Sequence, residues 1–243
     1  MNGIDVDAVV FDVDGTLADT APDLAAALNH ALTCLGRTTV PVESVRHLVG
    51  HGARALLRKG LAATGDDSEA LVEAGFPHFL DYYGANICVG TRVYEGLEEA
   101  LDALAGRGIA LAICTNKFEW LTLRLIEALG WTGRFQSIVG GDTVGVRRPD
   151  PAPLREAIAR TGGGRALFVG DSITDADTAR AAGVPLVAVS FGFSDRPARQ
   201  LGADAVIDHY SELLPALARL RPAHARPAEG AGVGRLRRSK SDT

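Results

Sequence analysis

Cysteine is scarce in this sequence, and the few cysteines exclude two common stabilising devices. The chain has three, Cys34, Cys88 and Cys114, without a CxxC spacing or a neighbouring histidine pattern. A disulfide framework needs paired cysteines, and a structural zinc site needs closely spaced cysteine and histidine ligands. We therefore expect three reduced thiols, as in proteins of the cytosol.

Long apolar runs and a basic excess are also missing. No segment approaches the roughly 18 consecutive apolar residues of a membrane-spanning helix. The N-terminus lacks the basic start and the apolar stretch of a secretory signal peptide. The net charge of −5 disfavours a dedicated binder of nucleic acid or of an anionic membrane. These absences predict a cytoplasmic location.

The sequence does contain an alternation of two hydrophobic patterns. With 243 residues, 47% of them hydrophobic, the chain is long enough for one large domain or for a core with a smaller unit. Six short apolar runs are predicted to be buried strands, at residues 8–11, 109–114, 137–139, 166–169, 185–190 and 205–207. Helical stretches with apolar residues at three and four spacing follow the later runs. This alternation predicts an α/β fold with a doubly wound parallel sheet.

Residues 18–92 break this alternation. They contain no convincing strand and are predicted to form consecutive helices over residues 22–35, 41–48, 53–63 and 68–83. We expect an all-helical cap domain, inserted into a core domain that comprises residues 1–17 and 93–221. Residues 222–243 have five basic and almost no large apolar side chains, so they are predicted to be a disordered basic tail.

Polar side chains follow three of the predicted strands. They are Asp12 and Asp14 after the first, Thr115 and Asn116 after the second, and Asp171 with Asp175 after a later one. Because the carboxyl ends of parallel strands lie at one edge of a sheet, we expect these side chains to meet in one crevice. Alternating residues of an extended segment point the same way, so Asp12 and Asp14 can both face it, while Gly15 permits a sharp turn.

Three carboxylates in one crevice need a compensating cation. Asp12, Asp14 and Asp171 resist simultaneous ionisation when their charges lie a few ångströms apart. A ligand set of oxygen atoms, without histidine or cysteine, favours Mg²⁺. Taken alone, the DVDG segment is typical of a turn, and Asp171 is equally suited to a helix N-cap. Their shared sheet edge favours a phosphate site that holds Mg²⁺.

The same residues resemble the signature motifs of the haloacid dehalogenase superfamily of phosphatases. The first motif matches residues 12–17, the second matches Thr115 and Asn116, and the fourth matches residues 170–175. The likeness extends over roughly residues 6–220. It implies a Rossmann-like core and a phosphomonoesterase that depends on Mg²⁺.

The resemblance also implies roles for single residues. Asp12 attacks phosphorus and forms an aspartyl phosphate, while Asp14 protonates the leaving oxygen and later activates water. Thr115 hydrogen-bonds the phosphoryl oxygens. Mg²⁺ is bound by the side chains of Asp12 and Asp171 and by the backbone carbonyl of Asp14. Asp175 holds these ligands in place without binding the ion directly.

Arg148 stands where the family usually has a lysine before a proline. The segment RRPDPAPL places Arg147 and Arg148 ahead of that proline. Arg148 can supply a permanent positive charge to phosphate and to Asp12, and a surface arginine before a turn is the alternative. Lys117 is a second possible source of that charge. We also expect Asn116 and Lys117 to contact the substrate.

Three further segments resemble the phosphoglycolate phosphatases of this superfamily. They are VGHGARALL at residues 49–57, GDTVGVRRPDPAPL at 141–154 and FGFSDRPARQLGADAVID at 191–208. The resemblance implies hydrolysis of 2-phosphoglycolate, a small phosphorylated organic acid, and we expect a monomer or a homodimer. His51 and Arg54 are candidates for substrate contact from the cap, where Arg54 suits a carboxylate. For both, a solvated helix position or simple packing is the alternative.

Two other functions use a similar core. A phosphatase or phosphomutase that acts on another small metabolite, such as a sugar phosphate, would differ mainly in the cap. A signalling domain, in which a kinase phosphorylates Asp12, also has a sheet-edge aspartate, a metal and a hydroxyl residue. Asp14 and the predicted cap argue against the signalling domain, because such domains are small, uncapped and lack a built-in hydrolytic base.

Overall fold

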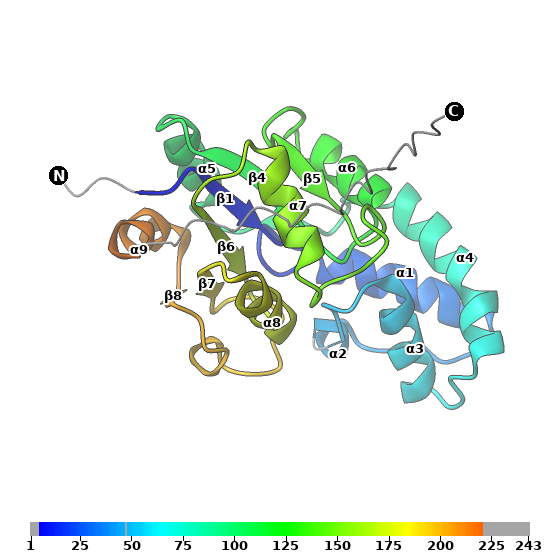
Figure 1. The fold of residues 1–243 in the computed structure, drawn as a ribbon. Coiled ribbons are helices and arrows are strands. Elements are labelled where there is room, and N and C mark those ends of the chain that lie inside the picture. Colours follow the sequence, from blue (N-terminus) through cyan, green and yellow to red (C-terminus); the bar gives the residue numbers. More distant parts are fainter. Residues whose placement is uncertain (1–4, 47, 221–243) are drawn as a thin grey trace, which may run out of the picture.

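A six-stranded parallel sheet forms the centre of the molecule (Figure 1). The computed structural model describes residues 5–46 and 48–220, so the predicted tail at 222–243 lies outside the described residues. The strands follow the order β5-β4-β1-β6-β7-β8. Their bounds are Ala8–Phe11 for β1, Ala110–Cys114 for β4, Ser137–Val139 for β5, Ala166–Gly170 for β6, Leu186–Val189 for β7 and Ala205–Ile207 for β8. All six predicted strands form, and the doubly wound α/β fold is confirmed.

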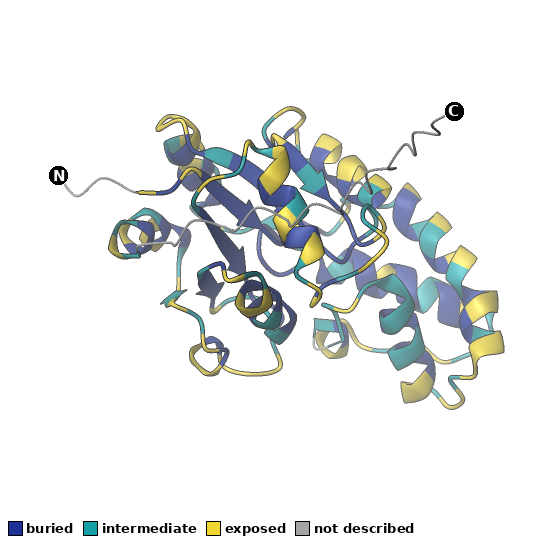
Figure 2. Cartoon of the chain, in the orientation of Figure 1, coloured by how far each residue is buried: buried dark blue, intermediate teal, exposed yellow. Residues whose placement is uncertain are grey.

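Helices cover both faces of this sheet because its strands are apolar on both sides. In β1, Val9 and Phe11 pack into one hydrophobic cluster, and Ala8 and Val10 pack into another. Helices α5 (Leu97–Ala105), α6 (Glu119–Ala128) and α9 (Leu213–Arg219) contribute to the first cluster, and α7 (Ala152–Arg160) and α8 (Ile173–Ala182) contribute to the second. Figure 2 shows the buried residues gathered on the strands and on the inward faces of these helices.

Four helices lie together at one end of the sheet (Figure 1). They are α1 (Ala21–Cys34), α2 (Val42–Arg46), α3 (Ala53–Ala63) and α4 (Glu69–Ala85). They share a hydrophobic cluster, in which Leu28, Leu32, Leu57, Leu61 and Phe79 are buried and to which α6 of the core contributes Leu121. This separate cluster supports our interpretation of the segment as a cap domain. None of the helices in the described residues is long and apolar enough to span a membrane.

The ends of this insertion differ from the prediction. Ala18–Asp19 and Arg92–Val93 form β2 and β3, which pair antiparallel, so the segment is not purely helical at its borders. Strands of two residues are too short to show a hydrophobic period, which is why the sequence did not reveal them. The pairing of β2 with β3 places the start and the end of the insertion side by side.

Asp23 of α1 forms hydrogen bonds with the segment that ends the insertion. Its buried carboxylate accepts hydrogen bonds from the backbone N–H groups of Val89, Gly90 and Thr91, at 3.0, 2.7 and 2.8 Å. The Thr91 hydroxyl donates to it as well, at 2.7 Å. Four donors on one carboxylate therefore hold the returning chain against the first inserted helix.

Candidate active site

The register of the sheet brings three strand ends together. Phe11, the last residue of β1, pairs with Ile113 of β4 on one side and with Val169 of β6 on the other. The residues that follow these strands therefore lie next to one another at the carboxyl edge of the sheet. They include Asp12, Thr115 and Asp171, which are 3%, 2% and 2% exposed. The register thus brings Asp12, Thr115 and Asp171 to one edge of the sheet, but the third carboxylate that clusters with Asp12 and Asp171 is Asp175 and not the predicted Asp14.

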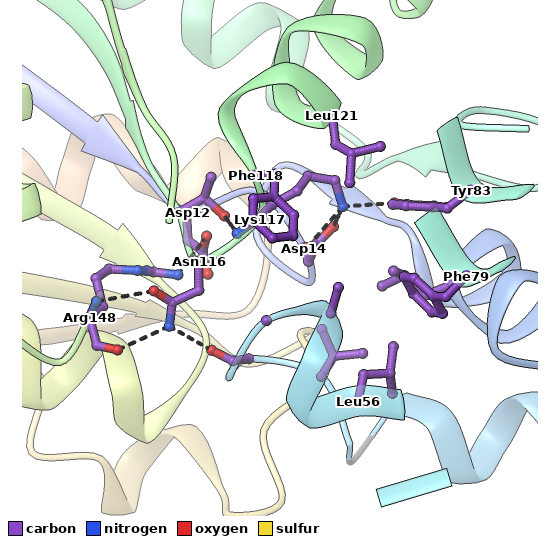
Figure 3. Close-up of a pocket in the computed structure, with 16 residues that line it drawn as sticks. Asp12, Asp14, Leu56, Phe79, Tyr83, Asn116, Lys117, Phe118, Leu121 and Arg148 are labelled. Carbon is purple, nitrogen blue, oxygen red and sulfur yellow. Dashed lines mark hydrogen bonds and ion pairs between the residues drawn. The ribbon is translucent and has the colours of Figure 1, made fainter. Parts of the chain in front are cut away.

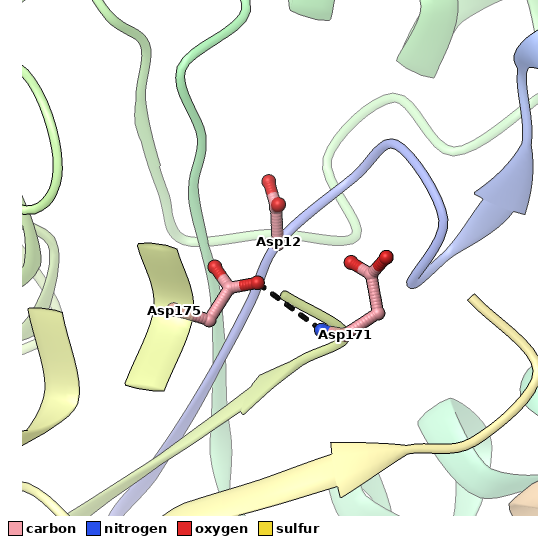
Figure 4. A group of neighbouring side chains, drawn as sticks. All are labelled: Asp12, Asp171 and Asp175. Carbon is pink, nitrogen blue, oxygen red and sulfur yellow. Dashed lines mark hydrogen bonds between the residues drawn. The ribbon is translucent and has the colours of Figure 1, made fainter. Parts of the chain in front are cut away.

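Three of the carboxylates form a buried acidic cluster (Figure 4). Oxygen atoms of Asp12, Asp171 and Asp175 lie within 4.8 Å of one another. The Asp171 oxygens accept hydrogen bonds from the Thr16 hydroxyl at 2.9 Å and from the Phe193 backbone N–H at 2.7 Å. These bonds fix the direction of the Asp171 carboxylate.

Asp175 is occupied by protein donors. Its Oδ2 accepts from the Ser172 hydroxyl at 2.6 Å and from the backbone N–H groups of Ser172 and Asp171 at 2.9 and 3.1 Å. Its Oδ1 is paired with Arg148. Ser172 is the N-cap of α8, so the alternative of Asp171 as the N-cap is excluded. Asp12 and Asp171 therefore remain the better candidates for direct metal ligands.

Glycine lets the backbone approach Asp171 closely. Gly15 has φ +83°, and a Cβ there would lie 2.5 Å from the Asp171 Oδ2 atom. A Cβ on Gly192 would lie 2.2 Å from the Asp171 Cβ atom. Side chains at either position would collide with the carboxylate, so glycine is required on both sides of it.

The electrostatics of the cluster favour a bound cation. Burial raises the pKa of Asp12 to about 6, and the charges of Asp175 and Asp14 add to this, while Arg148 opposes it. Burial also raises the pKa of Asp171 well above its usual range, with Asp175 and Asp12 contributing. A buried set of carboxylate oxygens, without nitrogen or sulfur ligands, fits a hard divalent cation.

Arg148 is buried and not on the surface, so the alternative of a solvated arginine is excluded. Its Nη2 atom lies 3.0 Å from Asp12 Oδ1, and its Nη1 atom is paired with Asp175. The guanidinium thus bridges the carboxylates of Asp12 and Asp175. Among the described residues, its buried Nε–H has no acceptor.

Asn116 joins the core to the insertion. Its amide nitrogen donates to the backbone carbonyls of Gly50 and Arg148, both at 3.1 Å. Its amide oxygen accepts from the Arg148 backbone N–H at 3.1 Å. The side chain of Asn116, for which the sequence predicts a substrate contact, thus holds Arg148 and the loop at Gly50 in position.

Lys117 and Asp14 form a second buried ion pair. The Lys117 Nζ lies 2.7 and 3.0 Å from the two Asp14 oxygens and 2.7 Å from the Tyr83 hydroxyl. The Thr20 hydroxyl donates to Asp14 at 2.7 Å. Lys117 therefore faces Asp14, and Arg148 is the cation that faces Asp12. The sequence did not reveal Tyr83 or Thr20, because each has an ordinary place in or beside a helix.

Two cavities lie between the sheet edge and the insertion. The first has a volume of about 450 Å³, and Asp12, Asp14, Thr115, Asn116, Lys117 and Arg148 give it a polar side (Figure 3). Its other walls are mostly apolar, from Leu24, Val49, Ala53, Leu56, Phe79, Phe118 and Leu121. The second, of about 490 Å³, also borders Asp14 and Asp171 but has a more polar lining that includes His51, Lys59 and Asp195.

The structure places the two cap candidates differently. His51 lines the second cavity, with its Nδ1 atom 3.5 Å from the Thr174 hydroxyl. Burial lowers the pKa of His51, and the nearby charge of Lys59 lowers it further. Arg54 lines neither cavity.

The partners of Arg54 belong to the insertion itself. Its guanidinium pairs with Glu73 at 2.7 Å and with Glu69 at 3.2 Å, and it lies 4.6 Å from the centre of the Phe76 ring. All three partners stand on α4, the neighbouring helix. The structure therefore corrects the expected position of Arg54, which pairs with carboxylates of the neighbouring helix and lines neither of the two cavities.

Comparisons with known proteins agree with this geometry. Residues 6–183 match the family described as haloacid dehalogenase-like hydrolase. A phosphoglycolate phosphatase of Mesorhizobium japonicum is 47% identical over 213 residues, which cover 86% of this chain and 94% of that protein. One from Agrobacterium fabrum is 42% identical over 211 residues, with 86% and 91% covered.

A solved structure has the same arrangement. The crystal structure of a predicted phosphoglycolate phosphatase from Haemophilus somnus superposes with a TM-score of 0.82 at 29% identity. The match covers 87% of this chain and 97% of that one. These shares are large enough to include the sheet and the inserted helices together.

Proposed function

Because this chain belongs to the haloacid dehalogenase-like hydrolase family, we propose that it is a phosphomonoesterase that hydrolyses 2-phosphoglycolate to glycolate and phosphate. One observation carries the chemistry: buried Asp12 belongs to an acidic cluster and pairs with Arg148, and Asp14 lines the same cavity. The relatives named phosphoglycolate phosphatase support the choice of substrate.

The metal that we propose is Mg²⁺. The side chains of Asp12 and Asp171 and the backbone carbonyl of Asp14 would hold it, and Asp175 would keep Arg148 and the Asp171 backbone in place. When bound, Mg²⁺ neutralises charge on the phosphoryl oxygens and on the carboxylates around them.

The first half of the reaction transfers the phosphoryl group to Asp12. A carboxylate oxygen of Asp12 attacks phosphorus, and the bond from phosphorus to the ester oxygen breaks. Asp14 gives a proton to that oxygen, which leaves as the hydroxyl of glycolate. Arg148 and Thr115 hold the phosphoryl oxygens during the transfer, and the unpartnered Arg148 Nε–H supports this role because a ligand could supply its acceptor.

The second half releases phosphate. Asp14 takes a proton from a water molecule as that water attacks phosphorus, and the bond between phosphorus and the Asp12 oxygen breaks. Asp12 returns to its starting form and Asp14 again holds a proton. The bond from the Thr20 hydroxyl to Asp14 supports this role, because it holds the carboxyl group at the cavity.

Free thiols are consistent with a cytoplasmic location, which we also propose. Cys34, Cys88 and Cys114 are unpaired in the structure. Burial raises the pKa of the Cys114 thiol to about 12, so this cysteine is chemically inert.

A substrate profile tests the function. The full chain is assayed against 2-phosphoglycolate, sugar phosphates and other small monoesters, each with Mg²⁺ and with a chelator. We expect 2-phosphoglycolate to give the highest kcat/KM and chelation to abolish turnover. Rapid turnover of a sugar phosphate without turnover of 2-phosphoglycolate would refute the substrate, and activity that survives exhaustive chelation would refute the metal.

A further inference from the structure

The first cavity contains two cationic side chains among the described residues that line it, and they face different groups (Figure 3). Arg148 bridges Asp12 and Asp175, so its charge is directed to the phosphoryl side of the cavity. Lys117 lies beside Asp14 and Tyr83, on the side of the leaving group. We propose that Lys117 binds the carboxylate of the substrate and makes the enzyme selective for esters that carry one, an inference that rests on the proposed function.

Because the walls of the cavity are mostly apolar, binding of a substrate carboxylate depends on a single cation. Leu24, Leu56, Phe79 and Leu121 line the part of the cavity that the leaving group would enter, and none can hydrogen-bond a carboxylate. An anion moved from water into such surroundings loses its hydration and needs a charged partner. The Lys117 ammonium, with only 3% of its side chain exposed, can provide a strong charge-assisted hydrogen bond there.

The length of the substrate suits this position. In 2-phosphoglycolate one methylene separates the leaving oxygen from the carboxylate carbon. The leaving oxygen must lie within hydrogen-bond reach of Asp14 to receive its proton. Because the Lys117 Nζ is 2.7 Å from Asp14 Oδ1, a carboxylate one methylene beyond that oxygen comes within reach of the ammonium.

The contacts of Lys117 in the structure also allow it to bind a substrate carboxylate. Two of its contacts are to Asp14, and the third is to the Tyr83 hydroxyl. Asp14 must turn toward the leaving oxygen to act on it, which withdraws its contacts from the ammonium. A substrate carboxylate would replace them, while Tyr83 keeps the Lys117 side chain in place.

The second cavity is the competing location for the carboxylate. Among the described residues, Lys59 and His51 line it together with three carboxylates, those of Asp14, Asp171 and Asp195, whereas the first cavity has two carboxylates and two permanent cations, so the second cavity is the less favourable place for an anion. The Lys59 Nζ lies 3.4 Å from the Leu48 carbonyl, outside the first cavity. Lys59 is therefore the matched control for Lys117.

The experiment compares two esters of similar size. One is 2-phosphoglycolate, and the other is 2-hydroxyethyl phosphate, in which a neutral CH₂OH group replaces the carboxylate. The measured quantity is the ratio of their kcat/KM values in the wild type, Lys117→Met, Lys117→Arg and Lys59→Met. We expect Lys117→Met to lower this ratio by about 10²-fold. Lys117→Arg should retain most of the preference, and Lys59→Met should change it by less than about threefold.

Each other outcome has a definite meaning. If Lys117→Met lowers both rates equally, Lys117 only positions Asp14 and the inference is wrong. If Lys59→Met removes the preference instead, the carboxylate lies in the second cavity and the inference is again wrong. Should Lys117→Met be unfolded, as judged by its thermal transition, Lys117→Gln and Lys117→Arg replace it in the same comparison.

The inference and the proposed function fail separately. A wild type that prefers a different carboxylate ester over its neutral counterpart, with the preference lost in Lys117→Met, refutes 2-phosphoglycolate and supports Lys117. A wild type with no preference for carboxylate esters at all overturns the inference, whichever phosphate ester it hydrolyses.

Discussion

The sheet edge and the inserted helices beside it are built differently. On the sheet side, Asp12, Arg148 and Asp175 are buried and bonded to one another. On the inserted side, His51 is exposed and Arg54 is partly exposed, and Arg54 bonds within the insertion. Strand register fixes the positions of Asp12, Arg148 and Asp175, whereas the positions of the residues on the insertion depend on how its four helices pack beside the sheet edge. Changes at Asp12, Arg148 and Asp175 should therefore reduce every reaction, whereas a change at Lys117, which bonds to Tyr83 of the insertion, should depend on the substrate.

The largest effect is expected at Asp12. Asp12→Asn removes the nucleophile but keeps the size of the side chain, so kcat should fall by about 10⁴-fold or more for every ester. Hydrolysis of 2-phosphoglycolate is measured together with mass spectrometry of the protein during turnover, which should detect an aspartyl phosphate in the wild type only. Full activity of Asp12→Asn, or a phosphorylated residue other than Asp12, would contradict the assignment.

Arg148 should show the next largest effect. Arg148→Met removes the cation that faces Asp12 and leaves Asp175 with an unpaired buried charge, so we expect kcat/KM to fall by about 10²- to 10³-fold. Arg148→Lys restores one charge without the planar fork and should stay within about tenfold of the wild type. Steady-state kinetics on 2-phosphoglycolate measure both.

The pair of Arg148 variants also sharpens the comparison between the two sides. Because Arg148 faces the phosphoryl group, both variants should affect 2-phosphoglycolate and 2-hydroxyethyl phosphate by the same factor. An effect confined to 2-phosphoglycolate would mean that Arg148 binds the carboxylate, and the division between a chemical side and a substrate side would be lost.

Metal removal should destabilise the sheet side in a manner that depends on pH. Burial raises the pKa of Asp12 to about 6 from 3.8 and raises that of Asp171 well above its usual range. In the absence of metal, such groups stabilise the fold below pH 3.8, and that contribution is lost as the pH rises through the folded-state value near 6. The chelated protein should therefore lose stability between pH 3.8 and about 6 through Asp12, and at higher pH through Asp171.

Bound Mg²⁺ favours the ionised carboxylates, so its effect should have the opposite pH dependence. Saturating Mg²⁺ should raise the Tm by about 5 °C at pH 7.5 and by less than half of that at pH 5. Differential scanning calorimetry with Mg²⁺ or with a chelator gives both values. Asp171→Asn is the control, and an Mg²⁺ shift that persists in this variant would place the ion elsewhere.

The sheet side could be predicted from the sequence for a specific physical reason. The apolar runs that become β1, β4 and β6 define parallel strands, and topology alone then gathers Asp12, Thr115 and Asp171 at one edge. No knowledge of side-chain packing is needed for that step.

The remaining contacts depend on packing between distant segments. Tyr83 reaches Lys117 only because α4 lies over the sheet edge, and in the sequence its ring is indistinguishable from a core position. The acidic residues that pair with Arg54 are on the surface of the same helix, where charged residues are common. The sequence therefore predicted which carboxylates gather at the sheet edge better than it predicted the contacts of the insertion.

The smallest effect is expected at Arg54. Arg54→Ala should change kcat/KM for 2-phosphoglycolate by less than about threefold and the Tm by less than about 2 °C, because a largely exposed ion pair contributes little. Steady-state kinetics and a thermal melt measure both quantities. Arg58→Ala is the matched control, since Arg58 also pairs with Glu69 from α3 and lines neither cavity.

A tenfold rise in KM for 2-phosphoglycolate in Arg54→Ala, without a change for 2-hydroxyethyl phosphate or in Arg58→Ala, would contradict this expectation. Arg54 would then have to leave Glu69 and Glu73 when the substrate binds, through a rotation of its side chain or a movement of α3 relative to α4. Such a movement would expose Phe76 to solvent as the guanidinium leaves its ring. The inserted side would in that case be rebuilt around each substrate, in contrast to a sheet edge whose carboxylates are already in place.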